Sequence, residues 1–126
     1  MPMKPWPVLM TTMAFCAITM AHAQERIAVH NARPLLIAAI DSPSGQAHGI
    51  LVGDIAEAIT QRFKGTTPIH IDVSTERRYA QPGCSRLKVR FWQDGVQLPG
   101  VPVPRRQTID FGVDYCRDGR PPKSPL

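Results

Sequence analysis

The sequence predicts an α+β domain in which one helix packs on a small, mostly antiparallel sheet, in the order β-α-β-β-β with one disulfide. Three observations lead to this class. Residues 50–64 carry an apolar stripe at helical spacing, residues 86–92 and 108–115 alternate between apolar and polar side chains, and Cys84 and Cys116 flank the two alternating segments. A helix with one apolar stripe and strands with one apolar face are stable together when they pack as two layers.

The first 23 residues are predicted to be a signal peptide and not part of the fold. Lys4 provides the positive start, residues 8–20 provide a short apolar stretch, and Ala-His-Ala at 21–23 provides the small residues that precede cleavage. The apolar stretch is shorter than the roughly 20 residues of a transmembrane helix. Cys16 raises the alternative of a lipidated start, but the residue before it is a bulky Phe. We expect cleavage near Ala23 and a periplasmic or secreted product with no transmembrane segment.

Removing 23 of the 126 residues leaves 103, which is enough for one small domain. We expect that domain over residues 24–116, followed by a flexible, proline-rich tail over residues 117–126. The first strand is predicted at residues 35–40, an apolar run. The helix is predicted over residues 50–64, with Gly65 placed to end it. Its apolar stripe consists of Leu51, Ile55, Ala58, Ile59 and Phe63.

The second strand is predicted at residues 69–73, and the last two at residues 86–92 and 108–115. We expect the last two to form an antiparallel hairpin in which the numbers of facing residues sum to 200. One side of the hairpin then pairs Leu87 with Val113, Val89 with Phe111, and Phe91 with Ile109. The other side pairs Arg86 with Asp114, Arg90 with Asp110, and Cys84 with Cys116. A slip of one residue would spoil all of these pairs. In the connection, Leu-Pro-Gly-Val at 98–101 fits a type II turn.

Cys84 and Cys116 are expected to form a structural disulfide, which places the mature chain in an oxidising compartment. A redox-active pair would normally have Cys-x-x-Cys spacing, and a metal site would need further His or Cys ligands nearby. The sequence offers neither. The bond closes a loop of about 33 residues, for which chain entropy gives about 3–4 kcal/mol, a large part of the stability of a small domain.

Charge is distributed unevenly along the chain. Residues 24–76 carry four basic and six acidic side chains, whereas residues 77–126 carry ten and four, so the net charge changes from −2 to +6. Such an excess of cations can bind an acidic partner, a nucleic acid or an anionic surface. The same cations can instead solvate the outer face of the hairpin, where Arg86 and Arg90 already have predicted carboxylate partners. We favour the second interpretation.

Few side chains point to catalysis or to a bound ligand. His70 and Asp72 lie on one face of a predicted strand, but nothing near them in the sequence supplies the nucleophile or third ligand of an acid–base or metal site. Asp54 and Glu57 are expected to complement the positive end of the helix dipole. The glycines at 49 and 53 lack the Gly-Lys-Ser/Thr ending of a phosphate loop. We therefore expect no enzyme activity, metal, cofactor or nucleotide.

The outer face of the hairpin is the candidate surface for binding a partner. Its candidate residues are Arg77, Arg78, Lys88, Arg90 and Trp92. Basic groups around an aromatic ring can anchor a protein interface or stack a nucleic-acid base. Aromatic residues spaced for successive bases are missing, so we expect an envelope protein or another acidic surface as the partner, and no nucleic acid. Trp92 can equally be a core residue beneath the 94–107 connection.

Two cysteine-containing segments resemble small exported proteins encoded among bacterial conjugation or type IV secretion genes. The segments are Pro82-Gly83-Cys84-Ser85-Arg86-Leu87 and Asp114-Tyr115-Cys116-Arg117-Asp118-Gly119, the second followed by Pro121-Pro122. The resemblance covers the C-terminal third of the chain. It implies an accessory or assembly protein of the envelope that binds other proteins and catalyses nothing. The alternative function is an exported inhibitor, or an envelope-stress binding module that recognises an acidic ligand or enzyme.

Overall fold

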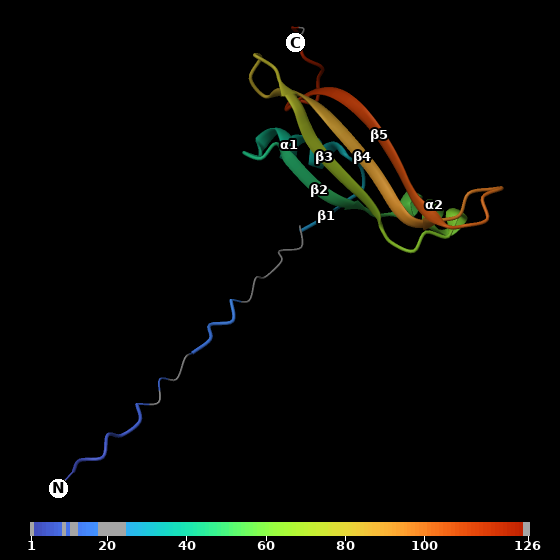
Figure 1. Ribbon diagram of the computed structural model, residues 1–126. Helices are drawn as coiled ribbons and strands as arrows, with labels where there is room; N and C mark the ends of the chain where they lie inside the picture. Colours follow the sequence, from blue (N-terminus) through green and yellow to red (C-terminus); the bar gives the residue numbers. More distant parts are fainter. Residues whose placement is uncertain (1, 9, 11–12, 18–24, 125–126) are drawn as a thin grey trace.

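The computed structural model describes residues 2–8, 10, 13–17 and 25–124, so the predicted cleavage site at Ala23 lies outside the described residues. The elements in chain order are β1 (Ile27–Val29), α1 (Arg33–Asp41), β2 (Gln46–Leu51), α2 (Asp54–Phe63), β3 (Ile69–Arg78), β4 (Cys84–Val96) and β5 (Arg105–Cys116). The strands form one sheet in chain order, in which β1 and β2 are parallel and the other neighbours antiparallel (Figure 1). The predicted α+β class is confirmed, and the predicted order β-α-β-β-β runs from β2 to β5.

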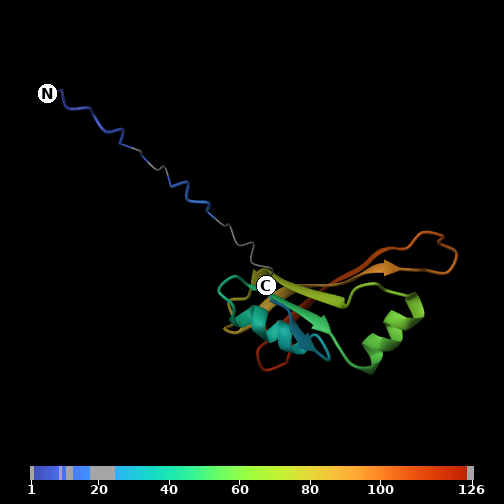
Figure 2. The same cartoon turned by 90° about the horizontal axis from the view of Figure 1, so that it is seen from below.

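Both helices lie on the same side of the sheet (Figure 2). We call that side the inner face and the other side the open face. The hydrophobic core lies between α1 and the inner face. Its largest fully buried side chains are Leu35 of α1, Ile71 and Val73 of β3, and Leu87 and Val89 of β4. Because side chains alternate along a strand, the residues between these core positions point to the open face.

Residues 35–40 belong to helix α1, so the predicted strand at this position is wrong. Pro34 lies in the first turn, where its missing N–H costs no helical hydrogen bond. The helix connects β1 to the parallel strand β2, a crossover that a tight turn cannot make. Leu35 packs on Gly49 of β2, where an added Cβ would lie 2.7 Å from Leu35 Cδ1 and 2.8 Å from the carbonyl oxygen of Ile27. Glycine at 49 therefore lets α1 and β1 approach β2 closely.

The second helix begins at Asp54 rather than at residue 50, because residues 46–51 form strand β2. Gly53, with a φ of 106°, separates the two elements. Positive φ is readily accessible only to glycine, which explains the position of the break. The helix ends at Phe63, close to the predicted end at Gly65.

The apolar stripe predicted for the helix is only partly covered. Leu51 belongs to β2 and not to α2. Ile55 is 75% exposed and Ile59 is 37% exposed, while Ala56 is buried. Helix α2 therefore packs only part of its apolar side against the sheet. The uncovered part forms one wall of the groove described below.

Strands β4 and β5 pair in the predicted register. The facing pairs include Cys84 with Cys116, Arg86 with Asp114, Leu87 with Val113, Val89 with Phe111, Arg90 with Asp110, and Phe91 with Ile109. In the connection, the N–H of Val101 donates to the carbonyl of Leu98 at 3.1 Å, and Gly100 has a φ of 77°, as the predicted type II turn requires. The hairpin register is confirmed.

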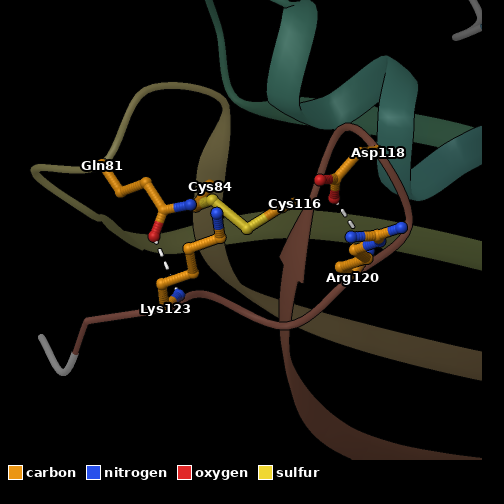
Figure 3. The surroundings of a disulfide bond; sticks show 6 residues. All are labelled: Gln81, Cys84, Cys116, Asp118, Arg120 and Lys123. Atoms are coloured by element: carbon orange, nitrogen blue, oxygen red, sulfur yellow. Dashed lines mark hydrogen bonds between the residues drawn. A yellow bond between two sulfur atoms is a disulfide. The ribbon is translucent and has the colours of Figure 1, made fainter.

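The predicted disulfide joins Cys84 to Cys116 at the end of the hairpin (Figure 3). The segment after β5 returns to the turn between β3 and β4. The N–H of Arg117 donates to the carbonyl of Gly83 at 2.8 Å, and the N–H of Lys123 donates to Oε1 of Gln81 at 2.8 Å. The start of the proline-rich segment is thus bound beside the disulfide.

Candidate functional site

The open face carries a row of polar side chains that crosses four strands. His48 of β2 faces Asp72 of β3, Asp72 faces Arg90 of β4, and Arg90 faces Asp110 of β5. Directly opposite residues on neighbouring strands are close enough to interact. The row therefore places alternating basic and acidic groups side by side across the sheet.

Asp72 is the most highly bonded side chain of this row. Its Oδ1 accepts from Nη1 of Arg26 at 2.9 Å and pairs with Nδ1 of His48 at 2.6 Å, and its Oδ2 accepts from Nε1 of Trp92 at 2.7 Å. Burial raises the pKa of Asp72, but the hydrogen bonds from His48, Trp92 and Arg26 outweigh burial and hold the pKa below its usual value. These three partners thus favour the ionised carboxylate.

Trp92 lies among the donors around Asp72. The His70 ring stacks on it, with ring centroids 3.9 Å apart, and the guanidinium of Arg106 lies 4.1 Å from the ring centroid. Burial lowers the pKa of His70, and the positive charge of Arg26 lowers it further. Trp92 is half-buried. Its ring is partly covered, as the core interpretation expects, but the side chains that cover it belong to the open face, where the interface interpretation places it.

The predicted binding cations of the hairpin are engaged by carboxylates. Arg90 forms a bidentate pair with Asp110, at 2.8 and 2.9 Å, and Lys88 lies 3.9 Å from the same carboxylate. The bidentate pair holds the pKa of Asp110 below its usual value. Arg77 and Arg78, at the end of β3, are exposed, and Arg78 reaches the carbonyl of Ser42 at 3.5 Å. Lys88, Arg90 and Trp92 thus follow one another along the open face of β4, and Arg77 and Arg78 lie at the exposed end of β3.

Further ion pairs extend along the open face. The pairs are Arg26–Asp72, Arg86–Glu76, Arg86–Asp114, Lys88–Asp110, Arg90–Asp110 and Arg106–Asp94. Five cations and five carboxylates take part, so the network is charge-balanced. The basic excess of the C-terminal half is consequently much smaller on this face than its sequence suggests.

The polar cluster ties strands β2, β3 and β4 together through Asp72. Asp72 orients His48 and Trp92, but within residues 25–124 no three His, Cys, Asp or Glu side chains lie close enough to hold a metal ion. The sequence singled out His70 and Asp72 and missed Arg26 and His48. The alternation in Gln46–Leu51 could have indicated a strand that carries His48 to this face.

An apolar groove lies on the inner face between α2 and the β4–β5 hairpin, and the sequence did not predict it. Its walls are Ile59 and Phe63 of α2 on one side and Phe91, Val96 and Ile109 of the hairpin on the other. The groove holds a volume of about 380 Å³. At its outer rim Ile109 is 66% exposed, which means that the groove is open to solvent.

The groove exists because α2 is tied to the hairpin mainly near its C-terminal end. Nε2 of Gln93 donates to Oγ1 of Thr60 at 2.9 Å and to the carbonyl of Thr67 at 2.8 Å. The N–H of Gln97 donates to the carbonyl of Phe63 at 2.8 Å. These bonds fix the position of α2 while leaving apolar side chains on both sides of the groove uncovered.

No protein family, curated protein or solved structure matches this chain. The disulfide is compatible with a periplasmic or extracellular location, where such bonds persist. In the part of the chain that the structure describes, no helix is both long and apolar enough to cross a membrane.

Proposed function

We propose that this chain is a small exported accessory or assembly protein that binds another envelope protein, in bacterial conjugation or type IV secretion. The observation that carries the proposal is the open apolar groove between α2 and the hairpin. Contiguous exposed apolar surface on a soluble domain usually marks a binding site. The assignment to conjugation or type IV secretion rests on the resemblance of the two cysteine-containing segments to exported proteins of those gene clusters. Neighbouring genes for a secretion channel would support this assignment.

The lining of the groove indicates the chemistry of the partner. Ile59, Phe63 and Ile109 offer aliphatic and aromatic surface, and the rings of Phe91 and Phe111 stack with centroids 6.0 Å apart to stiffen the hairpin wall. Burying apolar area against such walls contributes roughly 25 cal/mol per Å². We therefore expect the partner to insert an apolar segment of its chain.

The open face is a weaker candidate for the main contact. Its cations already have carboxylate partners, such as Arg90 with Asp110 and Arg106 with Asp94. A partner would have to desolvate these pairs or replace them, and charged residues are depleted in the centres of interfaces. Arg77 and Arg78 can supply polar contacts at the edge of an interface, and they are what supports the alternative of an acidic ligand.

Ile59→Glu is expected to lower partner recovery by at least about tenfold. The substitution replaces an apolar side chain that the bound partner would bury with an unpaired charge. The measurement is a pull-down from envelope extracts with the exported protein as bait. Ile55→Glu is the matched control, since Ile55 lies on the same helix, is 75% exposed and lies outside the groove lining.

Equal recovery of partners by wild type and Ile59→Glu would remove the groove from consideration. A double variant, Trp92→Ala with Arg90→Ala, tests the open face in the same experiment. If this double variant alone lost partner recovery, the contact would be assigned to the open face instead of the groove.

A further inference from the structure

The outer edge of β5 is a long strand edge with unpaired backbone groups. Strand β5 spans Arg105–Cys116, and within residues 25–124 it pairs with β4 alone. Natural proteins usually shorten, cover or bend such an edge, because it is a template for pairing with another strand. The opposite edge of the sheet, β1, spans just Ile27–Val29.

The backbone contacts define which residues of β5 face outward. The N–H of Arg117 donates to the carbonyl of Gly83, which faces it in the hairpin register. The Cα atoms of Cys84 and Cys116 are 4.0 Å apart, a separation typical of a pair without mutual hydrogen bonds. Along the regular register of residues 107–116, odd-numbered residues of β5 therefore bond to β4, and even-numbered residues direct their N–H and C=O to the edge.

The outward groups are available along the middle of the strand. At its end, the outward N–H of Cys116 is satisfied by the carbonyl of Arg120 at 3.0 Å. The residues that remain are Thr108, Asp110, Gly112 and Asp114. Exposed apolar side chains lie between them on the inner face: Ile109 is 66% exposed and Phe111 is 46% exposed.

We propose that the β5 edge binds the β5 edge of a second copy of this chain, as an antiparallel pair in which facing residue numbers sum to 222. The two-fold axis then passes between Phe111 and Phe111 of the second copy. A closed two-fold contact is the commonest form of self-association. The pairing joins two five-stranded sheets into one continuous sheet with all helices on one side.

This register matches the side chains on the inner face. Phe111 faces Phe111 of the second copy, and Ile109 faces Val113 of the second copy, so each apolar residue faces another. These are pairs without mutual hydrogen bonds, in which side chains approach most closely. The outward pairs, Thr108 with Asp114 of the second copy and Asp110 with Gly112 of the second copy, exchange the backbone hydrogen bonds.

The register also suits the charges of the open face. Arg86 lies over Gly112, where an added Cβ would be 2.8 Å from its Nη2. Because Gly112 has no side chain, Arg86 of the second copy occupies the space opposite Asp110. A carboxylate of one copy thus faces a guanidinium of the other.

Neighbouring registers lose one or both of these matches. A sum of 220 places Asp110 opposite Asp110 of the second copy, and a sum of 224 places Asp110 opposite Asp114 of the second copy. Like charges directly opposite each other are destabilising. A sum of 218 places Phe111 opposite Gln107 of the second copy. Over residues 107–115, a sum of 222 is the one register of these four that avoids both faults.

Disulfide cross-linking tests the register directly. Phe111→Cys is expected to form a covalent dimer on mild oxidation, because the pair at the axis has the Cα separation that a disulfide needs. Ile109→Cys alone is the matched control and should stay uncross-linked, whereas a mixture of Ile109→Cys with Val113→Cys should cross-link. Wild type gives the background: Cys84 and Cys116 are joined to each other, and Cys16 lies in the segment that export is expected to remove.

Sedimentation of the exported protein gives a second readout, which does not depend on whether the cysteine variants fold. Wild type should shift to twice the monomer mass as its concentration rises, and Thr108→Pro should remain monomeric, because proline removes an outward N–H without touching the bonds to β4. Ile59→Glu should dimerise like wild type, which separates this inference from the groove. A wild type that stays monomeric at every concentration, or equal cross-linking by Phe111→Cys and Ile109→Cys, would overturn the proposal.

Discussion

Replacing both bridging cysteines, Cys84→Ser with Cys116→Ser, is expected to lower the free energy of unfolding by about 3–4 kcal/mol. The two residues are 32 positions apart, so the bond removes much of the freedom of the unfolded chain between them. It also fixes the end of the hairpin at which the returning segment bonds to Gly83 and Gln81. A small domain is stable by only about 5–15 kcal/mol, so this loss is a substantial fraction of the total.

The measurement is urea unfolding of the double variant beside wild type, with and without reducing agent. Reduced wild type is the matched control, because it loses the bond without a change of side chain, and it should unfold at the same urea concentration as the variant. A difference between oxidised wild type and the variant of less than about 1 kcal/mol would show that the bond adds little to the fold.

Leu35→Ala is expected to lower the free energy of unfolding by about 2–5 kcal/mol, because it leaves a cavity at the centre of the core. Leu35 is 0% exposed and packs against Gly49 of β2. Ile55→Ala, on the other helix, is the control: Ile55 is 75% exposed, and its truncation should change stability by no more than about 0.5 kcal/mol. Equal losses in the two variants would mean that α1 does not form the core described above.

The hairpin register was predictable because three kinds of pairing agree on it. Apolar pairs such as Val89 with Phe111, the charge pair Arg90 with Asp110, and the cysteine pair each exclude a slip of one residue. Register is a local property of two neighbouring segments, so the sequence contains what is needed to determine it.

The first half of the fold was less predictable, for physical reasons. Residues 35–40 are apolar on all sides, and such a run does not distinguish a buried strand from a buried helix. Pro34, at a position suited to a helix start, and the alanines at 38 and 39 were the signals for a helix. The strand at residues 46–51 was obscured because its inner-face positions include the small residues Ala47 and Gly49, which leave room for α1.

The candidate site depends on contacts between distant segments. Asp72 and His70 share a strand face, which the sequence reveals, but Arg26 and His48 reach Asp72 from other segments. The groove was missed for a related reason. The sequence identifies the apolar stripe that contains Ile59, whereas the extent to which the sheet covers that stripe depends on where the helix is attached.

The position at which a partner touches the protein is the most direct test of the proposed function. A photo-crosslinking amino acid is placed at position 59, in the groove, and in a parallel experiment at position 88, on the open face, before irradiation of envelope preparations. We expect a partner adduct from the position of Ile59 and none from that of Lys88. An adduct from the position of Lys88 alone would contradict the assignment of the groove as the binding surface.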